Sequence, residues 1–138
     1  MTLRQSLHDY LRDTVDVSVH EGKLPIRPVM PALVQHFVAA STVQTHSNRR
    51  SLIPRRVQLD VYGNNDKDVD ATATKLLLAL DGYHGPMGDT TIGWATMLTD
   101  MDFPPTEIKG GEVRFRRTLD FEVAYQERGK LVVPSSSS

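Results

Sequence analysis

The sequence predicts one α+β domain, with an antiparallel sheet of about four to five strands and two helices packed on one face. Residues 55–81 show a period-two apolar pattern followed by a helical one. Residues 113–126 show a second strong period-two pattern. The expected order is helix, strand, strand, helix, strand, strand, which favours an antiparallel sheet covered by helices. We therefore expect a single domain over residues 1–127 and a flexible C-terminal tail over 128–138.

The N-terminal third is expected to contain a helix, an extended segment and a loop. Residues 2–13 fit an amphipathic helix, with Thr2 as N-cap and Gln5 completing a capping box. The following TVDVSV alternates valine with polar residues, as in an edge strand or an extended lead-in. Residues 21–31 contain three prolines, which remove backbone donors and predict a loop.

Two strands and a long connection follow. Residues 32–41 are mostly apolar and predict a largely buried strand, and residues 55–62 alternate as a strand with one buried face. The polar, basic segment 42–54 joins them. A connection of this length is uncommon in compact domains and is often functional.

The second helix is expected over residues 66–81, with Gly82 ending it and a glycine-rich loop over 82–90. Asp66, Asp68 and Asp70 resemble the start of a calcium loop, but the glycine and glutamate that such a loop requires are missing. We interpret these aspartates as helix-capping residues.

The last two strands are expected over residues 91–103 and 113–126. The first would place Ile92, Trp94 and Leu98 on one face, and prolines and glycines would form the link to the second. The second alternates clearly, and only Arg117 interrupts its apolar face. That apolar face consists of Phe115, Leu119, Phe121, Val123 and Tyr125.

Composition and motifs argue against several functional classes. There is no cysteine, so disulfides and cysteine-based zinc sites are excluded, and a net charge of −1 argues against a uniformly basic nucleic-acid-binding surface. No apolar run is long enough to span a membrane. The five histidines lack the spacing of a metal site, and no nucleophile motif is present. We expect no enzyme activity, no catalytic residue, no metal and no cofactor.

Arginines gather in two places, over residues 49–56 and 114–117. They indicate either a solvated or subunit-contact surface or, less favoured, a patch that faces DNA. The residues assigned to subunit or partner contact are Arg49, Arg50, Arg55, Arg56, Arg114 and Arg116.

Several short strings resemble the tail terminator, or tail completion, proteins of long-tailed bacteriophages. They are RVQLDVYG over residues 56–63, LDG over 80–82, and RRTLDFEVAYQE over 116–127, together with the proline-rich lead into the strand at 32–41. The resemblance covers most of residues 2–127. The long basic segment 42–54 and the extended C-terminal tail depart from the family pattern.

The resemblance implies a structural virion protein that forms a homo-hexameric ring at the tail–neck junction. Such a ring caps the tail tube, stops its polymerisation and joins the tail to the head–tail connector, while genome DNA passes through the lumen. Assembly would take place in the host cytoplasm, without a membrane and without a cofactor. Segment 42–54 and the tail after residue 127 would reach neighbouring subunits, neck proteins or tube proteins. The alternatives are another head–tail connector or neck adaptor, then a small nucleic-acid-binding module, and last a small enzyme.

Overall fold

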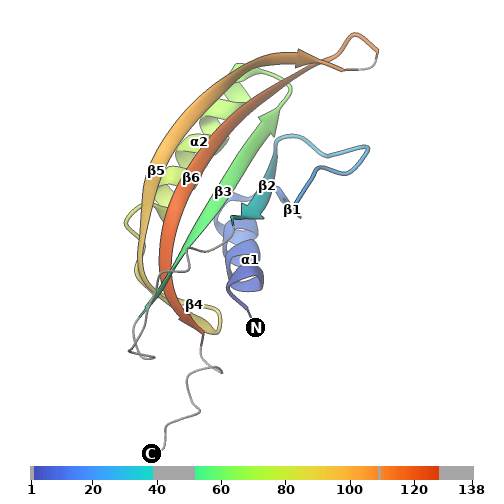
Figure 1. Cartoon of the computed structure of the whole chain (residues 1–138). Coiled ribbons are helices and arrows are strands. Elements are labelled where there is room, and N and C mark those ends of the chain that lie inside the picture. The colour runs from blue at the N-terminus through green and yellow to red at the C-terminus, as the bar shows by residue number, and fades with distance from the viewer. Residues whose placement is uncertain (1, 39–51, 109, 128–138) are drawn as a thin grey trace, which may run out of the picture.

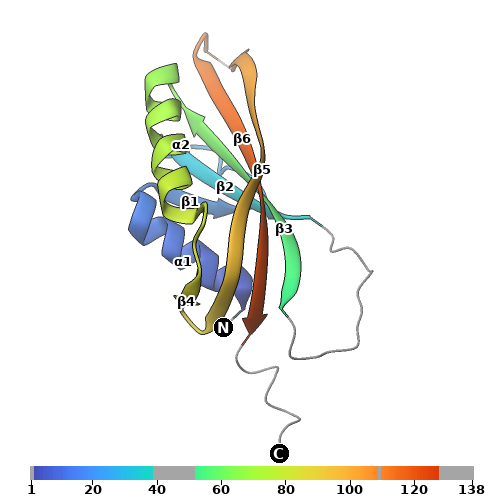
Figure 2. The ribbon, with the colours of Figure 1, turned by 90° about the vertical axis from the view of Figure 1, so that its left-hand side faces the viewer.

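The computed structural model describes residues 2–38, 52–108 and 110–127, which form two helices and one six-stranded sheet (Figure 1). In chain order the elements are α1 (Leu3–Val15), β1 (Ser18–Glu21), β2 (Ala32–Phe37), β3 (Ile53–Gly63), α2 (Asp66–Leu80), β4 (Gly85–Met87), β5 (Thr90–Glu107) and β6 (Val113–Glu127). The strand order across the sheet is β1-β2-β3-β6-β5-β4. Figure 2 shows both helices on the same side of the sheet.

The α+β class and the two helices on one face are confirmed, but the strand number and the purely antiparallel pairing are wrong. The described sheet has six strands, and β1 pairs with β2 in parallel, with Ser18 opposite Ala32. The loop over residues 22–31 carries the chain back to the end of the sheet where β1 started, so both strands run the same way. The segment expected as a glycine-rich loop contains the three-residue strand β4.

Local signals place the start of both helices and the end of α2 where the sequence predicts them, whereas α1 continues to Val15, two residues past its predicted end. The Thr2 hydroxyl accepts the Gln5 backbone N–H at 3.2 Å, and both halves of the capping box are present. The Asn65 side chain accepts the Asp68 backbone N–H at 2.8 Å, so Asn65 caps α2 and Asp68 lies in its first turn. Gly82 follows α2 with a φ of 83°, a left-handed conformation that glycine adopts without strain.

The hydrophobic core lies between the two helices and the facing side of the sheet. Its largest fully buried side chains include Leu7, Leu11, Leu59, Leu76, Leu80, Leu119 and Phe121. Gln35 is also fully buried on this side, and its amide donates to the Arg4 carbonyl at 3.0 Å and to Glu21 Oε2 at 2.9 Å. Because a buried amide needs partners, Gln35 ties β2 to both α1 and β1.

The strand β5 differs most from expectation. Register shifts occur between Ile92 and Trp94, between Met97 and Thr99, and beyond Phe103. Each shift interrupts the alternation of side chains. Ile92 is therefore buried, whereas Trp94 and Leu98 are 45% and 46% exposed, so the prediction that the three share one face is wrong. The strand also continues past Phe103 through Pro104 and Pro105, which an edge strand tolerates.

Candidate interaction surfaces

The face of the sheet turned away from the helices, here called the open face, carries a polar network around Asp60. The Asp60 side chain is only 2% exposed. It accepts the Thr118 hydroxyl at 2.6 Å and the Arg116 guanidinium at 3.4 Å, and His36 Nε2 lies 3.3 Å from it. These partners come from β2 and β6, the two neighbours of β3, so the network links the three strands that hold it.

Two arginines of the open face are held by groups of their own chain. Arg116 stacks on the Phe103 ring, with 4.4 Å between the guanidinium carbon and the ring centroid. Arg56 Nη2 lies 3.0 Å from Asp120 Oδ2, which also accepts the Thr99 hydroxyl at 3.1 Å. The charge of each guanidinium is thus balanced locally by a carboxylate.

On the open face, the pKa of one tyrosine is raised, and some buried polar atoms have no hydrogen-bond partner among the described residues. Burial and the nearby Asp60 carboxylate raise the pKa of Tyr62. Buried polar atoms without a hydrogen-bond partner among the described residues include the Nε atoms of Arg114 and Arg116 and the Oδ1 atom of Asp120. Such atoms are uncommon in folded proteins, because burial without a partner is unfavourable.

The six arginines assigned to contacts are therefore not equivalent. Arg49 and Arg50 lie outside the described residues. Arg55 lies over the Phe37 ring at 5.2 Å, while Arg56 and Arg116 make the ion pairs given above. Arg114 is on the open face as well, opposite Thr106 of β5. The role of these residues in subunit or partner contact stays a prediction.

Arg117, which interrupts the apolar face of β6, binds three carboxylates. It makes a two-point contact with Asp100, at 2.7 Å and 2.8 Å, and lies 3.0 Å from Asp70 and 3.8 Å from Asp102. This contact lowers the pKa of Asp100, and the hydrogen bond with Asp100 raises the pKa of Arg117. Three carboxylates against one guanidinium leave a net charge of −2. We call Asp70, Asp100 and Asp102 around Arg117 the acidic edge.

The outer side of β5 is open along this stretch. β4 pairs only with Thr90–Ile92. Beyond it, the Ala95 carbonyl accepts the Gly82 N–H, and the Met97 N–H donates to the Asp81 carboxylate. From Leu98 to Glu107, no strand among the described residues pairs with this side. Leu98 and Met101 are 46% and 55% exposed here.

The segment 22–31, here called the proline loop, projects from the other side of the molecule. Figure 1 shows it next to β1 and β2, on the side away from β5. It contains Lys23 and Arg27 but no acidic residue, and Ile26 and Val29 are 96% and 73% exposed. Among the described residues, no carboxylate forms an ion pair with either cation.

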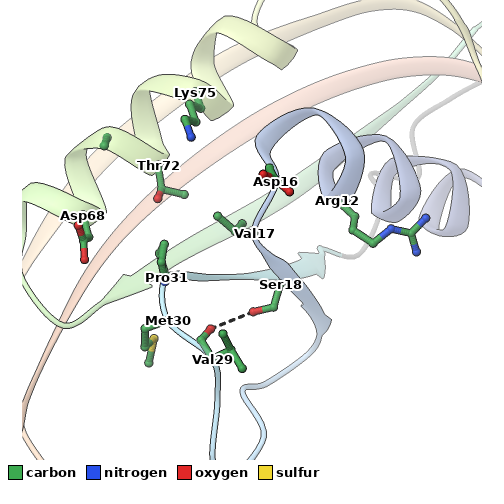
Figure 3. Close-up of a pocket in the computed structure, with 11 residues that line it drawn as sticks. Arg12, Asp16, Val17, Ser18, Val29, Met30, Pro31, Asp68, Thr72 and Lys75 are labelled. Carbon is green, nitrogen blue, oxygen red and sulfur yellow. Dashed lines mark hydrogen bonds between the residues drawn. The ribbon is translucent and has the colours of Figure 1, made fainter.

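A cleft lies beneath the proline loop, between the end of α1 and the side of α2 (Figure 3). Its volume is about 500 Å³. Its charged side chains are of both signs: Arg12, Lys75, Asp16 and Asp68. The Ser18 hydroxyl, its one serine, donates to the Val29 carbonyl at 3.0 Å and helps to fix the base of the loop. The lining contains no histidine and thus no serine–histidine pair for nucleophilic catalysis.

The described part of the chain contains neither a cluster of metal ligands nor a membrane-spanning helix. No group of three histidine or acidic side chains within it is arranged to hold a metal ion. Neither of the two described helices is long and apolar enough to cross a bilayer.

Sequence reasoning missed the acidic edge, the Asp60 network and the exposure of the proline loop. The sequence did contain a signal for the acidic edge, because an arginine within an apolar stripe needs carboxylates nearby. The aspartates that supply them lie on α2 and β5, and only the fold brings them together.

Comparison with known proteins gives structural matches only. No protein-family model and no curated protein matches the sequence. Among solved structures, a chain of the virion of a native gene transfer agent particle matches with a TM-score of 0.53 and 15% identity, over 88% of this chain and 90% of that one. A second structure, whose name states no function, matches with a TM-score of 0.50 and 14% identity, over 87% and 89%. The chain shares its fold with both over nearly their full lengths.

Proposed function

We propose that this chain is a structural virion protein of a tailed bacteriophage or a related particle. The observation that carries the proposal is the shared fold with a chain of a gene transfer agent virion over 88% of one chain and 90% of the other. Its length of 138 residues fits a small protomer whose work is done by its surfaces. Assembly with other virion proteins, and localisation in the virion, follow from this proposal.

The finer proposal is a tail terminator. The two longest strings that resemble this family lie on β3 and β6, and these strands pair antiparallel from Ile53 opposite Tyr125 to Gly63 opposite Phe115. The resemblance therefore involves two strands that meet in the centre of the sheet. In this role the chain forms a hexameric ring on the end of the tail tube, stops tube growth and presents the surface that joins the head.

The exposed surfaces of this chain support the assembly of a ring through two different patches of each subunit. A closed ring requires heterologous contacts, in which one patch of a subunit meets a different patch of the next. The proline loop and the unpaired edge of β5 are two such patches, and they lie toward opposite edges of the sheet. We propose a non-enzymatic role, with genome DNA passing through the lumen of the ring.

Another head–tail connector protein is the nearest alternative, because the name of the virion neighbour does not specify a component. A nucleic-acid-binding module is less favoured. Arg56 and Arg116 of the open face already contact Asp120 and Asp60, so fewer free cations remain to neutralise phosphates.

The first test is the mass of the purified protein by light scattering, followed by negative-stain images. We expect rings of about six subunits with a central opening. Addition of tail tubes tests the finer role, since a terminator binds the tube end and prevents elongation. A strict monomer that ignores tubes and binds duplex DNA with a steep dependence on salt would contradict the proposal and favour the nucleic-acid module.

A further inference from the structure

Two exposed surfaces of this chain are complementary in charge. The proline loop contributes Lys23 and Arg27 without an acidic residue, and the acidic edge carries a net charge of −2. In the acidic edge, the Asp70 and Asp102 side chains are 63% and 76% exposed and thus accessible to a partner. Opposite potentials on two surfaces steer their association and fix its register.

Exposed apolar side chains lie in the proline loop and along the same stretch of β5. Ile26 and Val29 are among the most exposed large apolar side chains of the described residues, and they lie between and beside the two cations of the loop. Leu98 and Met101 are half exposed on the same stretch of β5; Met101 lies opposite Thr118 on the open face, whereas Asp100 and Asp102 lie opposite Leu119 and Arg117 on the helix side. Exposed apolar groups rimmed by charges are typical of protein contact sites.

One molecule cannot bring these surfaces together. The proline loop connects β1 and β2 at one edge of the sheet, whereas β5 lies near the other edge, with β3 and β6 between them. Figure 1 shows the loop and β5 on opposite sides of the molecule. A contact between them therefore requires a second copy, and repetition of that contact links the copies head to tail.

We infer that the proline loop of one copy docks on the acidic edge of the next copy and forms the subunit contact of the ring. Lys23 and Arg27 face the carboxylates around Arg117, while Ile26 and Val29 pack along the unpaired edge of β5 beside them. The inference rests on the proposed ring-forming function and specifies which surfaces build the ring.

Charge reversal provides the test. The loop variant carries Lys23→Asp with Arg27→Asp, and the edge variant carries Asp70→Lys with Asp102→Lys. Each variant alone places like charges across every contact, so we expect the association constant to fall roughly a hundredfold or more. In a 1:1 mixture, alternating copies place the acidic loop of one variant on the basic edge of the other, and at the next contact the unchanged basic loop on the unchanged acidic edge. Every contact then joins opposite charges, and assembly is expected to return as alternating rings.

Sedimentation velocity and native mass spectrometry at one protein concentration measure these assemblies. The matched control is Asp9→Lys with Asp13→Lys on α1, which changes the net charge as the edge variant does and should assemble like the wild type. A second edge variant, Asp70→Asn with Asp102→Asn, removes the two charges but retains the side-chain size, so it tests the contact if the lysine variant misfolds. Circular dichroism confirms the fold of every protein.

The outcomes separate this inference from the proposed function. Loss of rings in each variant and recovery in the mixture supports the contact. Rings formed equally well by the wild type and by both folded variants would overturn the contact and leave the ring intact. A wild type that forms no ring, alone or on tail tubes, would overturn both. Rings lost in the variants without recovery in the mixture would show that the loop and the edge meet some other surface.

Discussion

Replacement of Arg117 by leucine tests the most unusual element of the core. The sequence pattern alone predicts that leucine completes the apolar face of β6 and stabilises the protein. The structure predicts the opposite, because Arg117 holds Asp100 by two short contacts and also reaches Asp70 and Asp102. Its removal leaves three carboxylates close together without a cation.

The expected loss is about 2–3 kcal/mol of unfolding free energy. The side chains of Arg117 and Asp100 are 20% and 27% exposed, so their paired contact is only partly screened and contributes about 2 kcal/mol. The exposed Asp70 and Asp102 add at most about 0.5 kcal/mol each. Burial of the leucine returns up to about 1 kcal/mol, and repulsion among the carboxylates offsets part of that gain. For a chain of this size, the melting temperature should fall by roughly 8 °C.

The same contact predicts a dependence on pH. Because the pKa of Asp100 is lowered in the folded state, its contribution is complete above the unfolded value of about 4 and is lost as the pH falls through the folded value. The wild type should therefore begin to lose this increment as the pH falls below about 4, while Arg117→Leu should not.

Chemical denaturation of both proteins at pH 7 and pH 3 measures these differences. Dilution to several protein concentrations removes any contribution from self-association. Arg117→Met serves as a second apolar replacement with a longer side chain. A leucine variant as stable as the wild type at pH 7, or more stable, would refute this account of the contact.

Three further perturbations are predicted. Asp60→Ala should lower the free energy of unfolding by about 2–4 kcal/mol, because Thr118 and Arg116 lose their buried acceptor. The loss should be larger than for Asp60→Asn, and urea denaturation of both variants measures the difference. Asn65→Ala should cost about 1 kcal/mol through loss of the α2 cap, measured as a lower thermal midpoint, and an unchanged midpoint would contradict the cap. Ile26→Asp should alter monomer stability by less than about 0.5 kcal/mol, since its side chain is 96% exposed, yet weaken self-association in sedimentation experiments.

Elements with a strong, uninterrupted period could be predicted from the sequence. The alternation of β6 identifies its buried face correctly, with Leu119, Phe121 and Val123 fully buried. The capping residues Thr2 and Gln5 mark the start of α1, because the capping box is a local interaction. In such cases the neighbouring residues contain the whole signal.

The rest depends on contacts between distant segments. In β5, bulges interrupt the alternation, and nothing local in the sequence places them. The parallel pairing of β1 depends on the path of the proline loop. The partners of Arg116 and Arg117 depend on the register of β6 against β3 and β5, which a period of two does not specify. Arginines in similar sequence contexts therefore differ in how many carboxylates neutralise their charge.

The central pairing of β3 with β6 has a consequence for biosynthesis. Residues 53–63 find their main partner only in residues 113–127, so this pairing closes a long loop and forms slowly compared with local contacts. While the ribosome is still producing the segment before β6, the hydrogen-bonding edge of β3 lacks this partner and the apolar face of α2 lacks part of its cover. The nascent chain is then most exposed to aggregation, and stalled or truncated products are natural substrates for chaperones and proteases.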